Sequence, residues 1–128
     1  MRFMMLMIPN DYAAANADAR PSAEAVAEMM KFNAALKEAG ALIALDGLHP
    51  PATGARVSFS NGQPSVALGP FPGAKEMLGG YWMIDVASRD EAIAWASKCP
   101  AADGDMIEIR QVFEMADFPP DVQAAVTL

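Results

Sequence analysis

The amino-acid sequence predicts an α+β fold of the ferredoxin-like sandwich type. Three observations predict it. The segments read in the order strand, helix, strand, hairpin, strand, helix, strand; both helical segments carry an apolar stripe; and the strands have one apolar and one mixed face. Two βαβ halves around an inserted hairpin bring both helices onto one face of a sheet. The 128 residues suffice for a single domain, which we place at residues 1–118, with a C-terminal tail at residues 119–128.

The first half of the chain predicts a strand–helix–strand unit. Residues 2–8 form an apolar run expected to be a buried strand. Ser22 is the expected N-cap of a helix and Gly40 its stop, which places the helix at about residues 23–39. Residues 42–48 predict the second strand.

The next segment predicts a β-hairpin. Residues 56–60 and 64–68 have strand composition, and Asn61-Gly62 between them tolerates the positive φ of a tight turn. Because Pro64 has no N–H to donate, we expect the hairpin at a sheet edge.

A loop rich in Gly and Pro, residues 69–80, leads into the next strand. Long ordered loops beside a central strand are common places for a site. Lys75 and Glu76 on this loop could touch a ligand or form an exposed ion pair. Gly79-Gly80 indicates a close backbone approach or a bulge rather than a phosphate loop, since no helix begins there.

The second half repeats the strand–helix–strand order. Residues 81–86 predict a buried strand, and Ser88 with Glu91 predicts a capping box at a helix start. Pro100 ends that helix, and residues 106–113 predict the last strand.

Three strands of the predicted sheet, at residues 42–48, 81–86 and 106–113, each carry one mixed face. In the strand at residues 42–48, Ile43 and Leu45 are expected on the apolar face and Leu42 on the mixed one. The polar members of the mixed faces are Asp46, Tyr81, Asp85, Glu108 and Arg110. Such a surface is too apolar to be left in water and too charged for a sealed core, because a buried unpaired carboxylate costs several kcal/mol. We therefore expect a homodimer in which a second subunit covers this face and leaves a polar cleft.

Composition excludes several classes of function. A net charge of −7 with nine Lys and Arg argues against a nucleic-acid partner and against an anionic membrane surface. The single cysteine, Cys99, excludes an internal disulfide and favours a cytoplasmic location. With one His and one Cys, we expect no metal site, and the chemistry we consider needs no cofactor.

The residues with acid–base chemistry are few. His49 is the only histidine, so proton transfer near neutral pH would use it; as a structural residue it would pack against Pro50. Asp46 could orient the imidazole or end its strand as a turn residue. Asp85, a charge in an apolar strand, is a second candidate partner.

Two arginines offer an anion clamp. Arg56 and Arg110 carry planar guanidinium groups suited to a carboxylate or phosphate. The structural alternatives pair them with Asp85 or with Glu108. The predicted ligand-binding residues are Arg56, Arg110, Glu108, Tyr81 and Lys75.

An ordered set of short motifs runs through the chain. They are Met1-Arg-Phe-Met4, Gly47-Leu-His-Pro50, Gly54-Ala-Arg-Val57, Gly69-Pro-Phe71, Lys75-Glu76, Gly80-Tyr-Trp82, Glu91-Ala-Ile93, Cys99-Pro100 and Ile107-Glu-Ile-Arg-Gln-Val-Phe-Glu114. With these motifs the chain resembles the YCII-related family, in particular its DGPF branch, over nearly its whole length. The resemblance implies a dimeric α/β barrel. In that family some members are thought to be small-molecule enzymes with a His/Asp pair, and others are encoded beside sigma factors.

One departure from the family pattern bears on function. Where the family has Asp-Gly-Pro-Phe, this chain has Leu68-Gly-Pro-Phe71. The lost carboxylate favours a non-catalytic ligand-binding or regulatory module that takes a small anionic ligand. The alternative is a cofactor-free isomerase or lyase in which His49 is the acid or base, with Asp46 or Asp85 as its partner.

Overall fold

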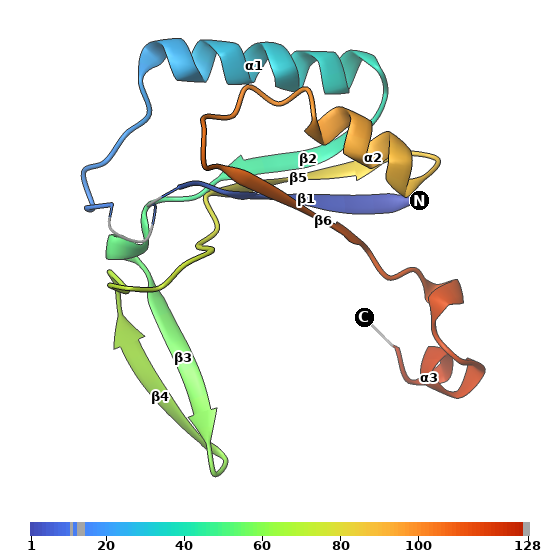
Figure 1. The fold of residues 1–128 in the computed structure, drawn as a ribbon. Coiled ribbons are helices and arrows are strands. Elements are labelled where there is room, and N and C mark those ends of the chain that lie inside the picture. The colour runs from blue at the N-terminus through green and yellow to red at the C-terminus, as the bar shows by residue number, and fades with distance from the viewer. Residues whose placement is uncertain (11, 13–14, 127–128) are drawn as a thin grey trace.

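The centre of the fold is a four-stranded antiparallel sheet with helices on one of its faces (Figure 1). The computed structural model describes residues 1–10, 12 and 15–126. The sheet strands are β1 (Arg2–Ile8), β2 (Leu42–Gly47), β5 (Gly80–Asp85) and β6 (Met106–Gln111). Their order is β2-β5-β1-β6, and every neighbouring pair is antiparallel. The helices over the sheet are α1 (Ala23–Glu38) and α2 (Arg89–Ala96). The predicted α+β class is confirmed, and this order is compatible with a ferredoxin-like fold.

Both helices begin where the sequence places their caps. Ser22 Oγ accepts the Ala25 N–H at 3.1 Å and starts α1. Ser88 Oγ accepts the Glu91 N–H at 3.2 Å, and Glu91 Oε2 accepts the Ala87 N–H at 2.6 Å, so the predicted capping box at α2 is confirmed. These bonds satisfy some of the backbone N–H groups that the first turn of a helix leaves without a partner.

The core lies between the helices and the sheet. Alternate residues of β1 and β5 point into it, and Met5, Leu36 and Ile84 are fully buried. Phe32 of α1 meets the Trp82 ring edge-on, with centroids 5.6 Å apart. These contacts fix which sheet face is covered and which is left open.

Strand β2 differs from the predicted alternation. Leu42 is opposite Ile84 and Ala44 is opposite Met83, so Ile43 is the extra residue of a β-bulge. Leu42 therefore packs on the core, whereas Ile43 is 50% exposed. The sequence prediction for these two side chains is wrong because it assumed an uninterrupted strand.

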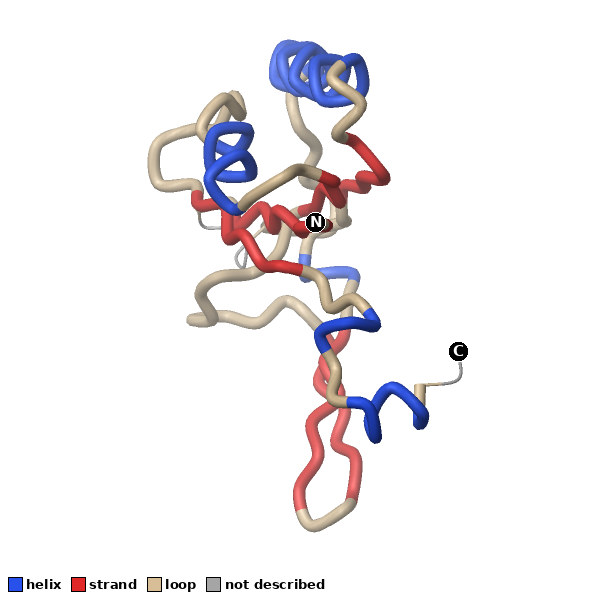
Figure 2. Tube along the Cα trace, turned by 90° about the vertical axis from the view of Figure 1, so that its right-hand side faces the viewer, coloured by secondary structure: helices blue, strands red, loops and turns tan. Residues whose placement is uncertain are grey.

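The hairpin forms a sheet of its own. Strands β3 (Ala55–Ser60) and β4 (Gln63–Leu68) pair only with each other, so each is an edge strand, as Pro64 predicts, but of a separate two-stranded sheet. The predicted Asn61-Gly62 turn is confirmed, with φ values of 52° and 76°. We call residues 55–68 the ribbon. It projects from the side of the sheet away from the helices (Figures 1 and 2).

The chain after β6 also projects to that side (Figures 1 and 2). We call residues 112–126 the C-terminal arm. It contains the 3₁₀ turn η3 (Met115–Asp117) and the short helix α3 (Pro120–Ala125). Phe113 and Phe118 stack with their centroids 4.9 Å apart. None of the helices in the described part of the chain has the length and apolar character needed to cross a membrane.

Candidate functional site

The sheet face away from the helices, which we call the open face, collects the predicted polar residues. Antiparallel register places Asp46, Tyr81, Leu6 and Glu108 in one row across all four strands. The neighbouring row is Ala44, Met83, Met4 and Arg110. Residues in register share a face, so the mixed faces align as the sequence predicts. The central residues of the open face are half-buried and its flanks are exposed.

The polar side chains of the open face mostly satisfy one another. Tyr81 donates its hydroxyl to Asp46 Oδ2 at 2.7 Å, and this bond, with desolvation and the nearby negative charge, raises the pKa of Tyr81. Arg110 Nη1 donates to Glu108 Oε2 at 3.2 Å, which is the structural alternative predicted for Arg110. An exposed pair of this kind contributes little to stability.

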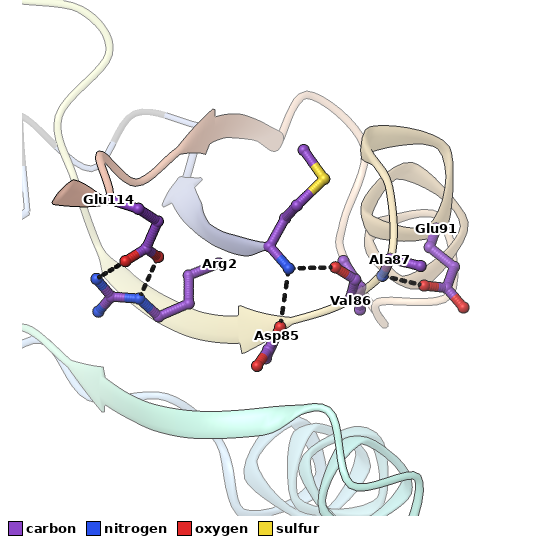
Figure 3. Close-up of polar contacts among 7 residues, drawn as sticks. Arg2, Asp85, Val86, Ala87, Glu91 and Glu114 are labelled. Carbon is purple, nitrogen blue, oxygen red and sulfur yellow. Dashed lines mark hydrogen bonds and ion pairs between the residues drawn. The ribbon is translucent and has the colours of Figure 1, made fainter. Parts of the chain in front are cut away.

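Asp85 takes a partner that the sequence prediction missed. Its Oδ1 lies 3.0 Å from the ammonium of Met1, which also donates to the Val86 carbonyl at 2.9 Å (Figure 3). Neither Arg56 nor Arg110 pairs with it among the described contacts, so that structural alternative for Asp85 is wrong. The Asp85 side chain is 62% exposed. A carboxylate in water with an ammonium partner is an ordinary surface ion pair, so its place in an apolar strand needs no catalytic explanation.

Beside Asp85, Arg2 and Glu114 form a bidentate ion pair (Figure 3). Arg2 Nε lies 2.7 Å from Glu114 Oε1, and Nη2 lies 3.1 Å from Oε2. The pair raises the pKa of Arg2 and lowers that of Glu114, chiefly through the hydrogen bonds. Sequence reasoning missed it because the two residues lie 112 positions apart. It ties the base of the C-terminal arm to β1.

A surface cavity lies at one end of the sheet, where β1 and β2 finish and β5 begins. Its volume is about 560 Å³, and its described lining is Pro9, Tyr12, Ala15, Ala19, Arg20, Pro21, Gly47, Leu48, His49, Pro50 and Gly79. Tyr12 donates its hydroxyl to the Leu48 carbonyl at 2.6 Å. Arg20 donates through Nη1 to the carbonyls of Ala17 and Ala19. The Tyr12 bond joins the loop before α1 to the loop after β2, whereas the Arg20 bonds lie within the first of these loops.

The close approach predicted for Gly79-Gly80 is confirmed at the edge of this cavity. A Cβ on Gly80 would lie 2.8 Å from the Asp46 carbonyl oxygen, and one on Gly79 would lie 2.5 Å from Pro9 Cγ. Gly79 also donates its N–H to the Met7 carbonyl and accepts from Leu48. Glycine at both positions lets three chain segments converge beside His49.

The structure separates the predicted catalytic residues. His49 is exposed and lines the cavity, whereas Asp46 is bonded to Tyr81 on the open face. No hydrogen bond or ion pair joins His49 to a carboxylate within the described ranges. Asp85 lies near the N-terminus, at the other end of β5. The predicted His/Asp pair is therefore not assembled by this geometry.

The predicted clamp residues also lie in different places. The Arg56 guanidinium sits 4.6 Å from the Phe71 ring centroid and contacts Met77 Sδ, whereas Arg110 belongs to the main sheet. Lys75 lines a second cavity of about 650 Å³. Arg20 is the cation that the structure adds to the surroundings of His49, and sequence spacing gave no signal for it.

Comparison with known proteins gives two findings. The sequence model of one protein family, the YCII-related domain, matches residues 1–116 of this chain. An uncharacterized protein of Rhizobium meliloti (strain 1021) is 42% identical over 59 residues, which are 46% of this chain and 48% of that protein. The chain thus spans about half the length of this relative.

Proposed function

The chain belongs to the YCII-related family, and we propose that it is a homodimeric binding module that takes a small anionic molecule in the cavity beside His49. The observation that carries the proposal is that Arg20 and His49 share a mostly apolar cavity whose described lining contains no carboxylate. A guanidinium in such a setting favours an anion.

The walls of the cavity suit a ligand with an apolar body. Leu48, Pro9, Pro21 and Pro50 provide apolar surface, and Arg20 provides the fixed charge. Arg20 uses Nη1 for the backbone carbonyls, which leaves its remaining N–H donors for a bound carboxylate or phosphate. A small aromatic or aliphatic carboxylate matches this combination.

The homodimer is proposed from the open face. Helices cover only one side of the sheet, and Met4, Leu6 and Met83 lie on the other side beside charged flanks. An antiparallel sheet can leave a polar face in water, but apolar side chains at the centre of the face favour a partner that covers them. The polar cleft predicted over this face would form only between two copies, since a single chain leaves it open.

A binding role is favoured over proton-transfer catalysis by the surroundings of the imidazole. An acid–base histidine is normally oriented by a partner group. Asp46, the predicted partner, is occupied by Tyr81 instead.

The single histidine makes ligand binding easy to follow by ¹H NMR, because His49 alone gives imidazole signals. We expect benzoate to shift these signals saturably and neutral benzamide to leave them in place. Arg20→Gln should abolish the benzoate response. Arg89→Gln, an exposed charge change on α2, is the matched control and should bind like the parent chain. Failure of benzoate, acetate and phosphate alike to move the signals would overturn the proposed site.

The dimer has its own test. We expect sedimentation equilibrium to give the mass of two chains, and Leu6→Lys on the open face to reduce it to one. Met30→Lys, on an exposed position of α1, should leave the mass unchanged. A single-chain mass for the parent protein would contradict the dimer.

A further inference from the structure

The ribbon has one wholly apolar face. Opposite residues in an antiparallel pair share a face, and the register pairs Ala55 with Leu68, Val57 with Val66 and Phe59 with Pro64. The other face is Arg56, Ser58, Ser60, Gln63, Ser65 and Ala67. This strict alternation is typical of a strand pair with one buried face.

Within a single chain that apolar face is uncovered. Phe59 is 75% exposed and Leu68 77%, and every residue of both ribbon strands is exposed. An isolated two-stranded hairpin is marginal in water, and a contiguous exposed apolar surface indicates an interaction site. We therefore expect another protein segment to cover the apolar face of the ribbon.

We propose that the apolar face of the ribbon packs against the C-terminal arm of a second copy of this chain. The inference rests on the proposed homodimer and specifies which elements its two chains exchange. Ribbon and arm project to the same side of the sheet as the open face, and Figure 1 shows them at opposite ends of it. A copy seated on the open face must occupy the space between them.

Symmetry brings ribbon and arm together. A two-fold axis perpendicular to the view of Figure 1, placed below the open face, exchanges left with right and top with bottom. It carries the arm of one copy to the end where the ribbon of the other projects. Both contacts form at once, because the interface is isologous.

The arm has matching surface. Phe113 is 67% exposed, and Met115, Val122 and Val126 are exposed as well. Its charges are Glu114, Asp117 and Asp121, whereas the only charge of the ribbon is Arg56. Pairing ribbon with arm keeps the carboxylates of the two arms apart, which matters in a chain of net charge −7.

Crosslinking tests the pairing of elements. In a Cys99→Ser background, one chain carries Phe59→Cys in the ribbon and a co-expressed chain carries Val122→Cys in the arm. A short bismaleimide should link the two different chains in preference to two copies of either. Met30→Cys on α1 replaces Val122→Cys in the control and should not link. Linking of Phe59→Cys to itself, or no linking in a sample with dimer mass, would overturn the inference.

Affinity gives a second measurement. Phe59→Ser should raise the dimer dissociation constant about 30-fold, the effect of truncating a central aromatic side chain. Ser58→Ala, on the polar face of the same strand, should leave it unchanged. If Leu6→Lys separates the dimer but Phe59→Ser has no effect, the ribbon contact is refuted and the open-face dimer stands. If the parent chain is a monomer, the open-face dimer and the ribbon contact are both refuted.

Discussion

The hydroxyl of Tyr81 donates to Asp46 Oδ2 at 2.7 Å across the β2–β5 pair, on the open face of the sheet. The neutral phenol makes this bond, and the phenolate would be repelled by the same carboxylate. The raised pKa of Tyr81 therefore reports the pairing directly.

Breaking this pair should lower the pKa of Tyr81. In a Tyr12→Phe background Tyr81 is the only tyrosine, so an ultraviolet alkaline titration reads it alone. We expect Asp46→Asn to bring its pKa back toward the ordinary value and Asp85→Asn to have little effect. Because the folded-state pKa is raised, the stability from this pair is present below the unfolded pKa and lost as pH rises through the folded one. Equal titration curves for the two variants would contradict this account.

The buried amide of Asn33 should matter for stability. Trp82 donates its Nε1–H to Asn33 Oδ1 at 2.8 Å inside the core. Asn33→Ala leaves the indole donor unpaired, and we expect the free energy of unfolding to fall by about 1–3 kcal/mol in urea denaturation. Lys31→Ala, on an exposed position of the same helix, should change it by no more than about 0.5 kcal/mol. A comparable loss in both variants would argue against the hydrogen bond as the cause.

Acid should loosen the base of the C-terminal arm. The pKa of Glu114 is lowered mainly by its hydrogen bonds to Arg2. A depressed carboxylate pKa contributes stability above the unfolded value, and that contribution is lost as pH falls through the folded one. We expect Glu114→Gln to be less stable than the parent near neutral pH and to converge with it on acidification. The exposed Glu38→Gln variant is the control, and a pH-independent difference for Glu114→Gln would refute the prediction.

Cys99 should be slow to alkylate. Burial, and secondarily the negative charge of Asp105, raise the pKa of its thiol to about 11. Iodoacetamide should therefore react slowly near neutral pH, with a rate that climbs with pH toward that value. A Met30→Cys chain in the Cys99→Ser background provides an exposed thiol for comparison. Reaction of both thiols at the same rate would show that burial does not protect Cys99.

Most elements of the fold could be predicted from local signals in the sequence. Ser22 and Ser88 mark helix starts through their own hydrogen bonds, and Asn61-Gly62 marks a turn through its backbone preference. Strand alternation correctly aligned the mixed faces, except at Leu42, where an inserted residue reversed the pattern. A bulge depends on what the neighbouring strands contact, which periodicity within one segment does not contain.

The parts that sequence reasoning missed depend on distant segments. Nothing local in Arg2 points to Glu114, and nothing in Asp85 points to the N-terminal ammonium. The cavity beside His49 is likewise built by loops before α1 and after β2. Composition identified the imidazole, but only the packed chain places Arg20 in the lining of the same cavity.

The root of the ribbon has a consequence for how quickly two chains could combine. Gly69 donates to the Gly54 carbonyl at 2.8 Å, and a Cβ at Gly69 would lie 1.6 Å from the Pro51 carbonyl oxygen. This close backbone contact fixes the direction of the ribbon relative to the main sheet before two chains meet. A preorganised element loses little conformational entropy on docking, so a larger share of the collisions between chains would lead to a complex. If the proposed dimer forms, we expect enlarging Gly69 to slow that step, because its Cβ would displace the Pro51 carbonyl at the root of the ribbon.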